Sequence, residues 1–284
     1  MRALIVGGDG MVGKALAAKL AEKGWQVFST SRRGTKGSLP LDLADLPARL
    51  DLPAVDVCFI CAAVTRQKDC AADENAARTV NVAAPARIAE SVAAAGGRSI
   101  LLSSNAVFDG EIPLRAAGSA PCPLNAYGRL KAEAEKPILA TRGGAVLRMT
   151  KILFPTHPLF GGWIAALKKG QKVRALAGLS LAPITLEGAV DALAQIASAG
   201  EEGIFQISAA GDIGYPEACR HIARGLGAPE NLVEEETLAA AGIDQADAPR
   251  FTSLDASRLA ALTGKPAPQP SAALDCVIAW SRRR

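Results

Sequence analysis

The segment RALIVGGDGMVGKAL, residues 2–16, begins with an apolar strand pattern and continues as a helical one. Between the two, Gly7, Gly10 and Gly13 follow a G-x-x-G-x-x-G spacing. Glycines at these points permit a tight turn, a close approach of the backbone to a pyrophosphate and close packing of the helix on the strand. Strand, turn and helix in this order predict a dinucleotide site with its anion at the helix N-terminus, against the alternative of a glycine-rich turn that binds nothing.

Beyond this unit, short apolar runs alternate with alanine-rich helical stretches. The runs are WQVFST (25–30), VDVCFICAA (55–63), RSILLSS (98–104) and GAVLRMT (144–150). Repeated strand–helix units of this kind predict an α/β fold with a doubly wound parallel Rossmann sheet.

The alternation changes after Ile152, where FPTHPLFGG (154–162) forms a loop rich in proline, glycine and aromatic residues. We therefore expect a Rossmann NADP-binding domain over 1–152, to which about 178–208 return. Residues 153–177 and 209–284 are expected to form a small discontinuous α/β substrate-binding domain.

The composition excludes several classes of function. The 284 residues carry a net charge of +4 with the charges scattered along the chain, which gives no basic stripe for nucleic acid. Six cysteines without disulfide spacing and only two histidines predict no metal site, and Cys58 and Cys61 read as parts of a buried strand. The sequence shows no apolar run of membrane-spanning length and no signal peptide pattern, so we expect a cytoplasmic protein.

The end of the second strand predicts the choice of nicotinamide cofactor. An acidic residue there would bind the ribose 2′-hydroxyl of NAD, and an arginine would accept the 2′-phosphate of NADP. This chain has Ser31, Arg32 and Arg33 in VFSTSRRG (27–34), which favours NADP(H). Two solvated surface arginines are the alternative.

In NAYGRLKAE (125–133), Tyr127 and Lys131 are four residues apart in a predicted helix. Residues at this spacing share one face, so the phenol and the ammonium can act in one site. The spacing permits a proton-transfer pair, but taken alone it favours two ordinary surface residues.

Together these segments resemble the extended short-chain dehydrogenase/reductase family, and within it the dTDP-4-dehydrorhamnose reductase branch, over nearly the whole chain. LLSSNAVFDG (101–110) is similar to the Ser-Thr-Asp-Tyr-Val-Phe-Asp-Gly stretch of the branch, and PLNAYGRLKAE (123–133) matches closely. The resemblance implies a catalytic set of Ser104, Tyr127 and Lys131. It also implies cofactor contacts from the glycine turn with Met11 and Val12, from Ser31, Arg32, Arg33, Asp42, Ala62, Ala63 and Asn81, and from Tyr127 and Lys131.

In the mechanism that the resemblance implies, Tyr127 donates a proton to a carbonyl oxygen to which Ser104 is hydrogen-bonded. Lys131 holds the nicotinamide ribose, and its charge lowers the phenol pKa from its usual value of about 10.

The sequence departs from the branch near the sugar. The predicted substrate-binding residues are Asn105, Ala106 and Lys151, where Ala106 replaces an aromatic residue and Lys151 stands near a tryptophan of the branch. The substrate therefore need not be the same 6-deoxyhexose nucleotide, and dehydration is disfavoured because the acid–base pair of the dehydratases is missing.

These observations predict an NADPH-dependent reductase of a keto sugar nucleotide, with a homodimer as an additional expectation. Two alternatives remain. One is a sugar-nucleotide epimerase with retained nicotinamide, and the other is a non-catalytic NADP-binding regulatory subunit, a role that some relatives of the branch have.

Overall fold

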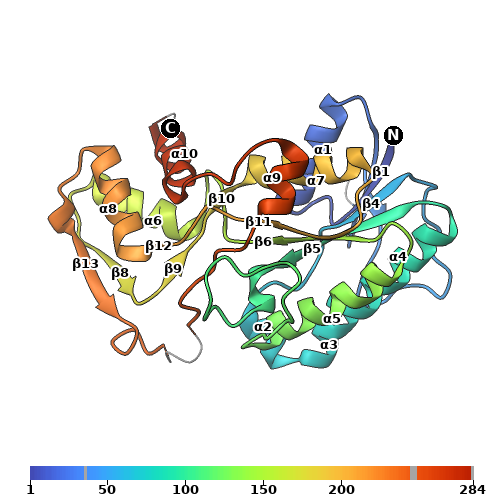
Figure 1. Ribbon diagram of the computed structural model, residues 1–284, viewed down its shortest axis with the longest axis horizontal. Coiled ribbons are helices and arrows are strands. Elements are labelled where there is room, and N and C mark those ends of the chain that lie inside the picture. Colours follow the sequence, from blue (N-terminus) through green and yellow to red (C-terminus); the bar gives the residue numbers. More distant parts are fainter. Residues whose placement is uncertain (35–36, 244–247, 283–284) are drawn as a thin grey trace.

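The structure is a computed structural model that describes residues 1–34, 37–243 and 248–282. Its largest element is a parallel sheet in the order β11-β6-β5-β4-β1-β2-β3 (Figure 1). The strands are β1 (Arg2–Val6), β2 (Gln26–Ser31), β3 (Leu39–Pro40), β4 (Val57–Ile60), β5 (Arg98–Ser104), β6 (Ala145–Met149) and β11 (Gly203–Ile207). The direction of winding reverses between β1 and β4, and the predicted doubly wound Rossmann fold is confirmed.

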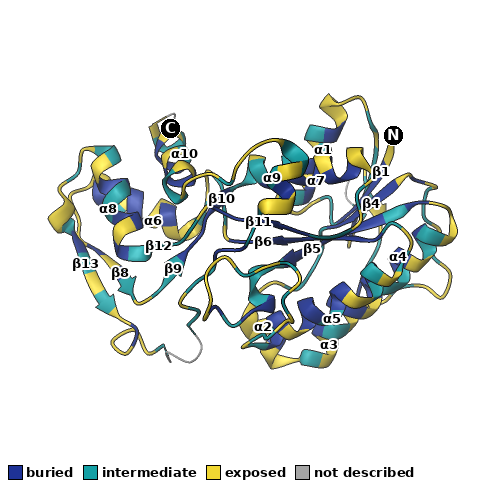
Figure 2. Cartoon of the chain, in the orientation of Figure 1, coloured by how far each residue is buried: buried dark blue, intermediate teal, exposed yellow. Residues whose placement is uncertain are grey.

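Helices cover both faces of this sheet, because successive strand residues bury apolar side chains on opposite sides. Ile5 and Phe59 belong to the core on one face, and Leu4 and Ile60 to the core on the other. The first face carries α1 (Met11–Glu22), α7 (Leu186–Ala199) and α9 (Ser257–Thr263) (Figure 1). The second carries α2 (Gln67–Ala72), α3 (Glu74–Arg78), the π-helical turn η1 (Thr79–Ala83), α4 (Ala84–Ala94) and α5 (Ala126–Ala140). The sheet is therefore buried on both sides, as the dark blue strands of Figure 2 show.

A separate apolar core, which we call the small lobe, lies beyond β6 and β11 (Figure 1). Its helices are α6 (Pro158–Lys168), α8 (Tyr215–Leu226) and α10 (Pro270–Arg282). Its strand pairs are β8 (Val173–Ala177) with β13 (Val233–Thr237), β7 (Ile152–Leu153) with β10 (Ile184–Thr185), and β9 (Ser180–Leu181) with β12 (Ile213–Gly214). The structure also has two 3-10 turns, η2 (Asn105–Val107) and η3 (Glu230–Leu232). Segments far apart in sequence thus share one core.

The predicted domain boundaries stay a proposal. Helix α9 lies in the predicted second domain, yet its Leu259 packs into the core of the large sheet. Strand β9 lies in the segment expected to return to the Rossmann domain, yet it pairs with β12. Residues 244–247 and 283–284 of the predicted second domain lie outside the described residues.

Candidate active site

The glycine turn after β1 is formed by close backbone contacts. Gly7 has a φ of +86°, and a Cβ there would lie 2.7 Å from the Cβ of Ala62. A Cβ on Gly13 would clash with the carbonyl oxygen of Gly7, so α1 packs directly on the turn. A Cβ on Gly10, the N-cap of α1, would meet no atom nearer than 3.3 Å. The turn therefore has its tight side against the protein and its open side at a helix N-terminus, which suits a pyrophosphate.

A cavity of about 430 Å³ lies beside this turn. Its lining includes Gly7, Ser31, Arg32, Arg33, Asp42, Ala62 and Ala63, all predicted cofactor contacts. Arg32 Nε lies 3.8 Å from Asp42 Oδ1 in an ion pair between two exposed side chains. The rim thus presents guanidinium groups where a 2′-phosphate is expected.

Asn81, another predicted cofactor contact, is hydrogen-bonded to the backbone of the loop after β4. It is buried in η1 and lines neither this cavity nor the cleft described below. Its Oδ1 accepts a hydrogen bond from the Val64 N–H at 2.7 Å, and its Nδ2 donates to the Val64 carbonyl at 2.9 Å. Asn81 therefore fixes the loop after β4, which carries Ala62 and Ala63, from behind.

Ser104 and Tyr127 meet at the end of β5. Ser104 is the last residue of that strand, Tyr127 lies in the first turn of α5, and the Ser104 hydroxyl interacts with the Tyr127 phenol. Ser104 Oγ also accepts a hydrogen bond from the Ala106 N–H at 3.2 Å. A Cβ on Gly128 would clash with the carbonyl oxygen of Ala106, so this glycine permits the contact of α5 with η2. We did not predict its role, although the Tyr-Gly pair was visible.

Lys131 lies one turn further along α5 and is buried. Its Nζ donates to the carbonyl oxygen of Leu102 at 2.8 Å and lies 5.9 Å from the ring centroid of Tyr127. Burial lowers the pKa of Lys131 to about 8, against the opposing charge of Glu135. Burial also raises the pKa of Tyr127 to about 12, although the Ser104 hydroxyl opposes this rise. Because burial dominates the phenol pKa, its lowering by Lys131 stays a prediction.

A cleft of about 700 Å³ joins the catalytic set to the small lobe. It is lined by the predicted residues Ser104, Tyr127, Lys131, Asn105, Ala106, Lys151, Met11, Val12 and Ala63. The opposite side contributes His157 and Tyr215, which we did not predict. Lys151 Nζ lies 6.0 Å from the ring centroid of Tyr215. All three predicted catalytic residues and all three predicted substrate residues therefore line one cleft.

A buried ion pair stands behind the catalytic residues. Arg148 Nε and Nη2 donate to the two carboxylate oxygens of Glu135 at 2.9 and 2.7 Å. Ser103 Oγ donates to the same carboxylate at 2.6 Å. The pair joins α5 to β5 and β6 one turn from Lys131. It was not predicted, although an arginine inside the apolar strand AVLRM was a signal.

Three further features of the described part of the chain concern metal ligands, thiols and membrane helices. There, no three His, Cys, Asp or Glu side chains are grouped so as to hold a metal ion. Cys58 and Cys61 are free thiols, and burial raises the pKa of Cys61 to about 12. No helix among residues 1–34, 37–243 and 248–282 is both long and apolar enough to cross a membrane.

The curated relatives include a transferase subunit and a reductase. Methionine adenosyltransferase 2 subunit beta of Xenopus tropicalis is 32% identical over 157 residues, which cover 54% of this chain and 47% of that protein. The chain therefore spans about half the length of such relatives. The probable low-salt glycan biosynthesis reductase Agl14 of Haloferax volcanii is 26% identical over 278 residues, 91% of each protein.

Solved structures and a family model agree on the architecture. The dTDP-4-dehydrorhamnose reductase of Bacillus anthracis in complex with NADP has a TM-score of 0.82 at 17% identity, covering 98% of this chain and 97% of that one. MoeE5 in complex with UDP-glucose and NAD has a TM-score of 0.81 at 22% identity, covering 100% and 99%. At these identities the likeness shows the fold alone. A family model described as RmlD substrate binding domain matches residues 1–282. The chain belongs to this RmlD family, within the extended short-chain dehydrogenases/reductases.

Proposed function

We propose that this protein is an NADPH-dependent reductase of a keto sugar nucleotide. The observation that carries the proposal is that Ser104, Tyr127 and, one turn further, Lys131 line the same cleft of about 700 Å³. The cleft and the dinucleotide cavity share Ala63, so a dinucleotide in the cavity and a substrate in the cleft can lie next to each other. The reductase relative and the structural neighbours that bind NADP, NAD or UDP-glucose support this assignment.

The chain's own residues have defined tasks in this reaction. When bound, a reduced nicotinamide supplies a hydride to the carbonyl carbon. Tyr127, whose pKa of about 12 keeps the phenol protonated at neutral pH, donates its proton to the carbonyl oxygen, and the C=O group becomes CH–OH. Ser104 donates a hydrogen bond to the same oxygen. Lys131 holds the ribose of the dinucleotide beside Tyr127.

The preference for NADPH rests on Arg32 and Arg33, which line the cavity where the 2′-phosphate would lie. Solved neighbours of this fold bind either NADP or NAD, so this preference is part of the proposal. The cytoplasmic location and the homodimer likewise stay predictions.

A second candidate is a non-catalytic, NADP-binding subunit. It is favoured by the 32% identity to a subunit of methionine adenosyltransferase. The Ser104, Tyr127 and Lys131 arrangement favours the enzyme, because a purely structural subunit has no need of a hydroxyl pair opening into a cleft.

The test is NADPH oxidation across a panel of 4-keto sugar nucleotides, with NADH in parallel and with release of retained nucleotide by denaturation as a check. We expect turnover with NADPH on at least one member. Tight NADPH binding without turnover on any of them would favour the subunit. Retained nicotinamide with net interconversion of sugar epimers would favour the epimerase.

A further inference from the structure

The described residues that line the cleft carry charge of one sign only. Among the described residues that line it there are two lysines, Lys131 and Lys151, and no aspartate or glutamate. Lys131 is buried and donates to the Leu102 carbonyl oxygen. Lys151 is exposed, and within the described part of the chain its ammonium forms no ion pair or hydrogen bond; it lies 6.0 Å from the ring centroid of Tyr215. Among the described residues, this ammonium is an unpaired charge in the lining of the cleft.

The sheet register places Lys151 near the reacting carbon. Met149, the last residue of β6, pairs with Ser104 of β5. Adjacent strands are about 4.8 Å apart, and two further residues advance the chain by roughly 7 Å, so a lysine stem from position 151 reaches groups next to the carbonyl held at Ser104. The Lys151 carbonyl oxygen accepts a hydrogen bond from the Ile184 N–H at 2.9 Å, which anchors the backbone there.

His157 lies in the same lining and has an unusual environment. Its ring is held between Phe154 and Phe160, with centroid distances of 5.2 and 5.0 Å. Its Nδ1 is buried and has no hydrogen-bond partner among the residues that the structure describes. Burial first, and the charge of Lys151 second, lower the pKa of His157, so the imidazole is neutral at neutral pH. Among the described residues, Lys151 is thus the cation of this part of the cleft, beside a neutral imidazole.

Two anions on a sugar nucleotide are candidates for Lys151. The diphosphate is attached at C1, across the sugar ring from C4. A C6 carboxylate hangs from C5, the direct neighbour of C4. A cation two residues beyond the partner of Ser104 fits the group beside the reacting carbon better than the group across the ring.

We propose that Lys151, with His157 beside it, forms a subsite for the carboxylate of the sugar, so that the substrate class is a nucleotide-linked hexuronic acid or its 4-keto form. The inference rests on the proposed function, because it uses the same cleft and the same reacting carbon. It narrows the keto sugar nucleotide to an acidic one.

UDP-glucose and UDP-glucuronic acid are suitable probes, because they differ only in CH2OH against COO⁻ at C6. Both are titrated calorimetrically into the full chain saturated with NADPH, and the corresponding dTDP sugars are run in parallel to remove the base as a variable. We expect the acid to bind about tenfold to a hundredfold more tightly, the range of a charge-assisted hydrogen bond. Lys151→Met should abolish this preference and leave the neutral sugar unchanged. Lys172→Met is the matched control, because Lys172 is an exposed lysine paired with Glu234 outside the cleft, and the preference should survive in it.

Each other outcome has a distinct reading. Equal affinity of the native protein for both sugars overturns the carboxylate subsite and leaves the reductase standing if the keto-sugar panel turns over. Equal weakening of both sugars by Lys151→Met assigns the lysine to the diphosphate, which also overturns the subsite. Failure of all four nucleotides to bind, together with no turnover on the panel, removes both the subsite and the proposed function.

Discussion

Helix α5 carries similar side chains at the same spacing on two faces with opposite surroundings. The inward face has Tyr127, Lys131 and Glu135 in steps of four, and the outward face has Arg129 and Glu133 in one such step. Lys131 and Glu135 are only 4% and 3% exposed, whereas the side chains of Arg129 and Glu133 are 50% and 39% exposed. The spacing determines which side chains can come into contact, and burial determines how much their interaction affects the free energy of unfolding.

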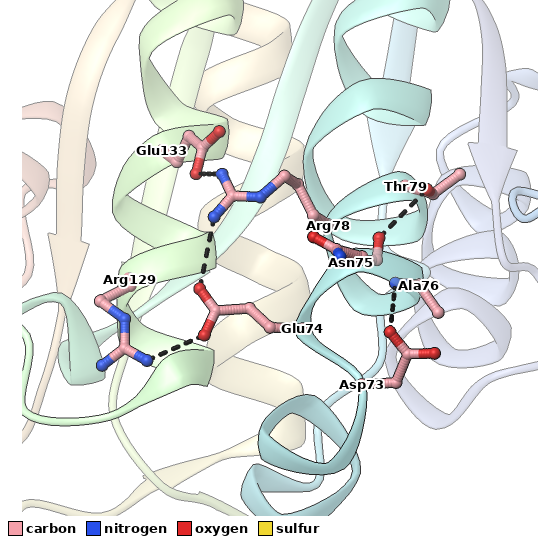
Figure 3. A network of polar contacts seen from close by, with 8 residues as sticks. All are labelled: Asp73, Glu74, Asn75, Ala76, Arg78, Thr79, Arg129 and Glu133. Atoms are coloured by element: carbon pink, nitrogen blue, oxygen red, sulfur yellow. Dashed lines mark hydrogen bonds and ion pairs between the residues drawn. The ribbon is translucent and has the colours of Figure 1, made fainter.

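The outward face takes part in an exposed chain of alternating charges between α3 and α5 (Figure 3). Arg129 donates to Glu74 at 2.9 Å, Arg78 donates to Glu74 at 3.3 Å, and Arg78 also pairs with Glu133. The hydrogen bond from Arg129 is the main cause that lowers the pKa of Glu74. In water such pairs contribute little individually, in contrast to the bidentate Glu135–Arg148 pair in the interior.

The largest expected effect is on the inward face, in catalysis. Tyr127→Phe keeps the ring and its packing but removes the proton, so turnover should fall by about 10²–10⁴-fold, the usual range for a lost general acid. NADPH oxidation gives the rate, and a fluorescence titration of NADPH should show unchanged affinity. Normal turnover in this variant would show that Tyr127 has no catalytic role.

The next effect is on stability. Glu135→Ala leaves the Arg148 guanidinium buried without a carboxylate, and the free energy of unfolding should fall by about 3–5 kcal/mol. Urea denaturation measures this loss. The double variant Glu135→Met with Arg148→Met should recover most of it, because no buried guanidinium then remains without its carboxylate. A double variant no more stable than Glu135→Ala would contradict this account.

Lys131 sharpens the comparison through pH. Its pKa is lowered to about 8 in the folded protein from 10.5, so between these values the unfolded chain holds more protons and stability rises with pH. Relative to Lys131→Met, the native protein should therefore gain up to about 1.4 kcal/mol per pH unit in this window, about 3 kcal/mol in all. Below pH 8 the difference should be constant. Urea unfolding at a series of pH values tests this, and parallel curves for the two proteins would refute it; Tyr127 is present in both and cancels.

Arg32 tests whether an exposed charge matters when a ligand is its partner. Arg32→Ala, and likewise Arg33→Ala, should weaken NADPH by about 1.5–3 kcal/mol because each removes a charge-assisted partner of the 2′-phosphate. NADH affinity and protein stability should change little. Titrations of both variants with both cofactors decide the point, and equal losses for NADPH and NADH would remove the assignment.

The smallest effect is expected two residues from Glu135. Glu133→Ala breaks the exposed pair with Arg78 and should lower the free energy of unfolding by only about 0.2–1 kcal/mol. It is the matched control for Glu135→Ala, on the same helix and with the same deletion. A loss as large as that of Glu135→Ala would show that burial is not the deciding variable.

Some of the molecule is readable from the sequence because its causes are local. The strand pattern and the spacing of Gly7, Gly10 and Gly13 predicted the sheet and the turn, since both depend on neighbouring residues. The local sequence does not show that Tyr127 faces inward and Arg129 outward. This difference arises only from the packing of α5 on β5. Asn81 was predicted as a cofactor contact, but its partner is the backbone of Val64, which no side-chain pattern reveals. His157 and Tyr215 reach the cleft through the assembly of the small lobe, which depends on contacts between distant segments.

The core of the small lobe combines segments that are distant in sequence, and this affects when the core is completed during synthesis. Phe160 of α6 packs in the same core as Ile222 of α8 and Leu274 of α10, and Lys168 donates to the Ser281 carbonyl oxygen across 113 positions. A ribosome adds about 5–20 residues per second, so α6 emerges roughly 5–20 s before α10 can cover it. During that interval α6 can pack on β8 and α8, but the part of the core that α10 supplies is missing. The lobe that forms one side of the cleft is thus the last part of the molecule to be closed during synthesis.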